Sequence, residues 1–127
     1  MQGTNILVLI VAAVAAFVAS VVWYTPFGGA VAALRDMGPA ESGAPIWAML
    51  FVIAQNLILA LMIAYLVSHL GVASLAGAVG LGALLWIFPA AILLGSVVHE
   101  GVPPALAGIH AGDWLAKLIL IAAIVGV

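Results

Sequence analysis

The chain has 127 residues, of which 69% are hydrophobic and only 5% charged. An ordinary soluble domain is about half apolar and about a quarter charged, so this composition excludes that class. The net charge of −2 offers no basic surface for nucleic acid, and the lack of cysteine excludes disulfides, thiolate catalysis and cysteine-based metal sites.

The first apolar stretch covers about residues 5–24, and a helix needs about 20 residues to cross a bilayer. No Lys or Arg precedes it, so we interpret it as a membrane span rather than a cleaved signal peptide. Trp23 is typical of the membrane–water interface, and Pro26 is expected to end the helix. Segment 27–45 is then predicted to be a polar loop, in which residues 30–37 could form a short interfacial helix.

The second and third apolar stretches cover about residues 46–67 and 72–98. Only residues 68–71 separate them, so we expect a tight turn that joins two antiparallel helices. Pro89 lies inside the third stretch and is expected to kink its helix.

The fourth stretch is expected to cross the membrane over about residues 106–127, after a connector that contains Pro103 and Pro104. The sequence therefore predicts an all-α fold: a four-helix transmembrane bundle that forms a single domain, with both termini on one side of the bilayer. Arg35 in the first loop favours a cytoplasmic first loop with both termini outside, but the loops carry few Lys and Arg residues in all. The alternative is that the chain inserts in both orientations and pairs antiparallel.

The fourth stretch also contains three polar groups: His110, Asp113 and Lys117. On a helix they lie within about 60° of one another, and Asp113 and Lys117 stand four residues apart. Charged groups at this depth need a partner, a water-filled cavity or a function. Three interpretations follow: a mutually neutralising pair, a polar path or proton relay that uses the histidine, and an interface with a neighbouring subunit.

A weaker hypothesis concerns metal binding at the junction of the third and fourth helices. His99, Glu100, His110 and Asp113 are ligand types that suit zinc and related ions. Their spacing matches no strong motif, so capping and hydration are expected for His99 and Glu100, and no metal or other cofactor is predicted.

Two amides and several glycines are expected to serve helix packing. Gln55 and Asn56 lie near the middle of the second span, where amides usually bond to a neighbouring helix; the alternative is that they line a pore. Small residues allow helices to approach closely, whether within one chain or between subunits. The candidates are Gly77, Gly80, Gly108 and Gly112.

Two stretches resemble a known family. The first is residues 23–28, Trp-Tyr-Thr-Pro-Phe-Gly, and the second is residues 99–103, His-Glu-Gly-Val-Pro, followed by His110, Gly112 and Trp114. Together they resemble domain of unknown function 1761, a family of small four-helix bacterial membrane proteins. The resemblance implies the same fold and a place in the bacterial cytoplasmic membrane, and it implies no reaction.

Two functions remain open from the sequence. The first is a structural or accessory membrane subunit that forms a homo-oligomer or joins a larger membrane complex. The second is a small transporter or channel whose polar path is lined by the fourth helix. A subunit should keep its charges paired and dry, whereas a transporter should expose them to a continuous cavity. No order of Ser, His and Asp supports a hydrolase, and we expect no enzymatic activity.

Overall fold

The computed structural model describes residues 5–34 and 46–126, and all of the regular structure in these ranges is helical. The helices are α1 (Ile6–Leu34), α2 (Ile46–Leu70), α3 (Leu75–Leu85), α4 (Ile87–Glu100) and α5 (Pro104–Gly126). α3 and α4 are separated only by Trp86 and together form one long element, so the described chain makes four rods. This arrangement confirms the predicted all-α four-helix bundle.

Each of the four rods is long and apolar enough to cross a membrane. The outside of the bundle is also apolar, with large side chains such as Leu7, Phe88 and Ile92 more than 60% exposed. A soluble monomer rarely exposes apolar area on this scale. Such an apolar outer surface is stable in contact with lipid, so the chain is an integral membrane protein.

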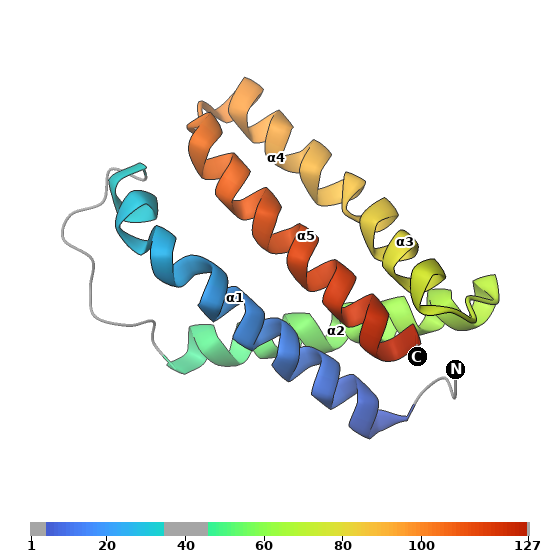
Figure 1. Ribbon diagram of the computed structural model, residues 1–127. Coiled ribbons are helices and arrows are strands. Elements are labelled where there is room, and N and C mark those ends of the chain that lie inside the picture. Colours follow the sequence, from blue (N-terminus) through green and yellow to red (C-terminus); the bar gives the residue numbers. More distant parts are fainter. Residues whose placement is uncertain (1–4, 35–45, 127) are drawn as a thin grey trace.

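α5 is the central helix of the bundle. It packs against all four other helices, and Figure 1 shows it between α1 on one side and α3 and α4 on the other. The core around it consists of a few branched side chains and many alanines, which let the helices approach closely. Its members include Ala12, Ala16, Ala60, Ala64, Val67, Leu118, Ile121, Ala122 and Val125.

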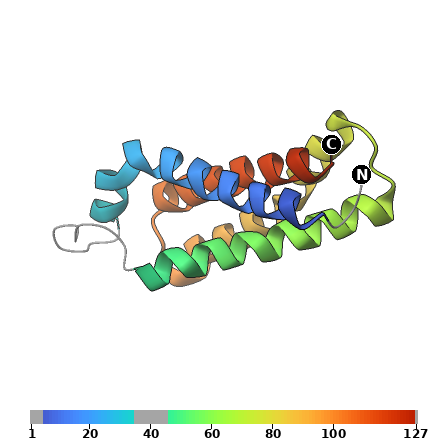
Figure 2. The ribbon, with the colours of Figure 1, turned by 90° about the horizontal axis from the view of Figure 1, so that it is seen from below.

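The ends of the helices define two ends of the bundle. α1 and α4 finish, and α2 and α5 begin, at what we term the loop end (Figures 1 and 2). α1 begins and α5 finishes at the opposite end, beside the turn between α2 and α3. Ile6 and Gly126 therefore lie at the same end, as an even number of spans requires.

α1 is longer than the sequence suggested. It does not stop before Pro26 but continues to Leu34, so residues 27–34 are helical instead of part of a loop. Prolines are tolerated in membrane helices when nearby hydroxyl groups and neighbouring helices stabilise the local backbone. Here the Thr25 hydroxyl donates to the Val21 carbonyl at 2.6 Å in the turn that precedes the proline. The predicted loop charges Arg35, Asp36 and Glu41 lie outside the described residues.

The turn between α2 and α3 comes three residues later than predicted. Residues 68–70 remain helical, and Gly71 then takes a left-handed conformation with φ of 68°. The Val72 N–H closes the turn on the Val67 carbonyl at 3.1 Å. Ser74 caps the next helix, because its hydroxyl accepts the Gly77 N–H at 3.0 Å.

The predicted disturbance near Pro89 occurs at Trp86, three residues earlier. Proline has no N–H for the carbonyl four residues before it and crowds that turn, which places the interruption upstream of the ring. The next break is at Gly101, which is left-handed with φ of 69° and ends α4. Pro104 then opens α5, the position at which a helix tolerates proline best.

Candidate functional site

An ion pair lies at the middle of α5. Lys117 Nζ is 3.3 Å from Asp113 Oδ2, and the two side chains are only 7% and 6% exposed. The spacing of four residues places them one turn apart on the same helix face. Lys117 Nζ also lies 4.2 Å from the centroid of the Trp114 ring, where a cation is attracted to the π face.

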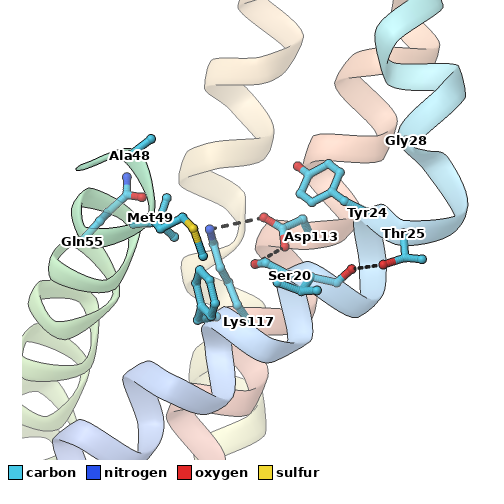
Figure 3. Close-up of a pocket in the computed structure, with 12 residues that line it drawn as sticks. Ser20, Tyr24, Thr25, Gly28, Ala48, Met49, Gln55, Asp113 and Lys117 are labelled. Carbon is cyan, nitrogen blue, oxygen red and sulfur yellow. Dashed lines mark hydrogen bonds and ion pairs between the residues drawn. The ribbon is translucent and has the colours of Figure 1, made fainter. Parts of the chain in front are cut away.

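A serine from another helix completes the surroundings of the carboxylate. Ser20 Oγ in α1 donates to Asp113 Oδ1 at 2.6 Å, so each carboxylate oxygen has a partner. Figure 3 shows the pair between α2 and α1, with the Ser20 hydroxyl directed at Asp113. Such charge-assisted hydrogen bonds are stronger than neutral ones, and this one ties α1 to α5.

The ion pair forms part of the wall of a cleft of about 880 Å³ between α1, α2 and α5. α1 contributes one continuous face over about three turns, and α2 contributes a shorter face opposite it. The lining residues are Phe17, Ser20, Val21, Tyr24, Thr25, Gly28, Ala48, Met49, Val52, Gln55, Asp113 and Lys117. Asp113 and Lys117 are the only charged residues among them.

The cleft lies in the half of the bundle that is nearer the loop end. Its lining runs from Gly28 and Ala48, toward the end of α1 and the start of α2, inward to Phe17 and Lys117. Beyond that depth the described helices are filled by the alanine-rich core, which includes Ile121, one turn past Lys117. The charges are therefore paired as a subunit would keep them, yet they face a cavity as a transporter would. The cavity is not a continuous path.

The two predicted amides have different positions. Gln55 lines the cleft, whereas Asn56 is fully buried on the side of α2 that faces α1. The Asn56 amide donates to the Ala13 carbonyl, with a long N–O distance of 3.5 Å. Its Oδ1 has no hydrogen-bond partner among the described residues. Asn56 is thus a contact between helices, and Gln55 is the amide that a ligand in the cleft could reach.

His110 is joined to α1 rather than to the ion pair. Its Nδ1 lies 2.5 Å from the Tyr24 hydroxyl, and the two rings are tilted with centroids 5.7 Å apart. Tyr24 lines the cleft, but His110 is not among the lining residues. The predicted set of three polar groups on α5 is therefore split: the ion pair faces the cleft, and the histidine stands one turn toward the loop end.

The weak metal hypothesis gains no support from the geometry. His99 and Glu100 lie exposed in the last turn of α4. Within residues 5–34 and 46–126, no group of three or more His, Asp or Glu side chains is close enough to hold a metal ion. Asp113 instead uses its two oxygens for Ser20 and Lys117.

Only one of the four candidate packing glycines lies at a close contact between helices. A Cβ atom built at Gly112 would collide with the Trp23 ring, so this glycine makes room for a side chain of α1. Gly80 and Gly108 have nothing within 4 Å, and Gly77 approaches only Ser74 and Val72 just before it. The close approach between α3 and α5 occurs instead at Gly82, which would meet the Leu118 carbonyl at 2.8 Å.

Three residues that hold the site together were not predicted to do so from the sequence. Ser20 is the only hydroxyl-bearing residue between Ile6 and Val22, a signal that could have singled it out. Trp23 was assigned to the interface, but its indole N–H donates to the Ile109 carbonyl at 2.8 Å. Trp86 donates in the same way to the Ala111 carbonyl at 2.8 Å. The two tryptophans position the first half of α5 from opposite sides.

The composition of the cleft wall is compatible with the binding of a small molecule. The Ser20 hydroxyl donates directly to the Asp113 carboxylate. The cleft offers apolar walls with a few polar groups at its inner end, the usual composition of a small-molecule pocket.

Comparison with known proteins adds a family but no activity. No curated protein and no solved structure matches the chain. A family model described as a protein of unknown function, DUF1761, matches residues 7–126, nearly the whole chain. The residues that line the cleft and form the ion pair all lie within the matched range, and the chain belongs to the DUF1761 family.

Proposed function

We propose that the protein is a small, non-enzymatic transporter of the bacterial cytoplasmic membrane, and that the cleft between α1, α2 and α5 is its solute-binding site. The observation that carries the proposal is the position of the Asp113–Lys117 pair in the cleft wall. Ionisable groups inside a membrane are costly and usually mark a solute path. The cleft volume also lies within the range of about 300–1,000 Å³ that is typical of ligand sites.

The one-ended shape supports a carrier rather than an open channel. A carrier opens its site to one side of the membrane at a time, by movement of helices around the bound solute. In this structure the cleft lies in the half of the bundle nearer the loop end, and the alanine-rich core fills the other half. In the second state, the helices around Ile121 separate and the loop end closes.

Single cysteines can test both states, because the natural chain has none. In proteoliposomes sorted for one orientation, we expect Val21→Cys to react with a membrane-impermeant maleimide from the loop-end side. Val22→Cys is the matched control: Val22 is 66% exposed and outside the cleft, so its thiol lies in lipid. Thiolates form in water, so Val21→Cys should react at least about tenfold faster than the control.

The second state predicts that Ile121→Cys reacts from the opposite side, although Ile121 is fully buried here. Its control is Leu120→Cys, the neighbouring and less buried position on α5. Reaction of Ile121→Cys above that control supports alternating access. An Ile121→Cys thiol that never reacts, beside a reactive Val21→Cys thiol, means that the cleft does not alternate and that the transporter proposal is wrong.

A second candidate is the structural or accessory subunit that self-associates. The observation in its favour is that α4 has no buried residue, so this helix leaves most of its surface for lipid or for another subunit. Gly108 on α5 is similarly open, with nothing within 4 Å of its built Cβ. Both features would fit a second copy of the chain.

The two glycines of α5 separate association from folding. If Gly108 is at an interface between subunits, Gly108→Leu should lower the oligomer mass in native mass spectrometry and leave the thermal stability nearly unchanged. Gly112→Leu is the contrasting variant, because its side chain would collide with Trp23 in the same chain. Overpacking of this kind costs about 1–3 kcal/mol, so its melting temperature should fall. An unchanged mass for Gly108→Leu would count against this interface.

A further inference from the structure

We infer that the cleft selects uncharged amphiphiles: molecules with an apolar body and a neutral polar head, such as an alcohol or a carbonyl compound. The inference rests on the proposed binding role of the cleft and names its ligand class. Its basis is the charge of the cleft wall. Among the described residues, Asp113 and Lys117 are the only charged ones that line it, they are 3.3 Å apart, and their charges cancel.

A charged ligand would disturb this balance. Either ion of the pair already has its counter-ion within contact distance, and Asp113 also accepts a hydrogen bond from Ser20. An anion placed beside Lys117 would stand next to the Asp113 carboxylate, and a cation beside Asp113 would stand next to the ammonium group. In both cases one buried charge is left without compensation, which is the costly situation in a site of low polarity. A neutral head leaves the pair intact.

The inner end of the cleft can nevertheless bind a polar head. The Lys117 ammonium group has three donors, of which Asp113 takes one. Gln55 lines the cleft from α2, and its amide makes no hydrogen bond to the described residues. A hydroxyl or carbonyl group can accept from either of these donors. The hydroxyls of Ser20 and Thr25 already donate to Asp113 and to the Val21 carbonyl.

The walls between this end and the mouth suit an apolar body. Phe17 and Val21 of α1, together with Met49 and Val52 of α2, line these walls. From Phe17 to Gly28 the α1 face rises over 11 residues, about 16 Å, which matches an alkyl chain of about ten to twelve carbons. The ligand then lies with its head at the ion pair and its tail toward the loop end.

A series of three probes with the same tail tests the charge preference. Dodecan-1-ol, dodecanoate and dodecylammonium, each with a diazirine at mid-chain, are photolysed with the protein in nanodiscs. The measured quantity is labelling of residues that line the cleft, such as Phe17, Val21, Met49 and Val52. It is taken relative to labelling of the exposed residues Val18 and Leu50, which lie on the same two helices but do not line the cleft. We expect this ratio to be at least about tenfold higher for the alcohol than for either ion.

Variants of the pair should redirect the preference. Asp113→Asn leaves a lone cation and should shift the highest ratio to dodecanoate, and Lys117→Met leaves a lone anion and should shift it to dodecylammonium. The double variant has no charge at either position, so its highest labelling ratio should again be that of dodecan-1-ol. The wild type and the double variant suffice where a single variant does not fold.

The outcomes separate this inference from the proposed function. A wild-type cleft that is labelled best by a charged probe overturns the neutral-ligand inference while the binding role stands. Equal ratios for all three probes, above the lipid-facing background, also overturn the inference. If none of the three probes labels the cleft above that background, both the inference and the proposed function are wrong.

Discussion

Asp113→Asn is expected to lower the stability of the protein by about 3–5 kcal/mol, because it leaves the Lys117 ammonium group buried without its counter-ion. Lys117→Met should lower the stability by a similar amount, because it leaves the Asp113 carboxylate buried without its counter-ion. Both side chains are more than nine-tenths buried, so water compensates a lone charge at either position only weakly. The double variant removes both charges at once and should be much more stable than the sum of the single effects predicts.

The measurement is a double-mutant cycle, read as thermal stability in one fixed detergent. Glu100→Gln is the matched control, because it also converts an acid to an amide, but at an exposed position at the end of α4. Its effect should stay within about 0.5 kcal/mol. If the two single variants were near neutral and additive, water would have to reach Asp113 and Lys117 independently, and the pair would not be a structural unit.

The pair itself was predictable, because its two members lie on one helix and helix geometry fixes their separation. Its third partner was not predictable in the same way. Ser20 is 93 residues from Asp113 in the chain, and the contact depends on how α1 rotates against α5. The cleft depends on three helix faces at once, so Gln55 could be listed as polar but could not be distinguished from Asn56 as the residue that faces the cavity.

The number of helices could be predicted from the sequence, but the end of α1 could not. The number of spans follows from hydrophobic length, which is a local property, and it was predicted correctly. The end of α1 was not, because proline was judged by its cost in an isolated helix of about 3 kcal/mol. In the folded chain, the surrounding residues reduce that cost: Trp23 bonds to α5 just before Pro26, and the Thr25 hydroxyl bonds within the turn.

Glycines illustrate why packing needs the three-dimensional structure. The third span contains Gly77, Gly80 and Gly82 within six residues, and the sequence offers no basis for choosing among them. Residues two apart on a helix point about 160° away from each other, so at most one of Gly80 and Gly82 can face α5. The structure assigns that place to Gly82, whose Cβ position is within 3 Å of backbone atoms of Leu118 and Ile119.

Gly82→Ala is therefore expected to destabilise the bundle by about 1–3 kcal/mol, the usual cost of forcing extra atoms into a packed core. The obstacle is the backbone of α5 rather than a flexible side chain, so the two helices must separate to admit the methyl group.

Gly80→Ala is the matched control two residues earlier, where nothing lies within 4 Å. There alanine should be neutral or should stabilise the helix by up to about 1 kcal/mol, because it restricts the unfolded backbone. In the same detergent, the melting temperature of Gly82→Ala should therefore fall, whereas that of Gly80→Ala should stay unchanged or rise. A common shift for both would mean that the methyl group acts only through helix propensity and that α3 does not pack on α5 through Gly82.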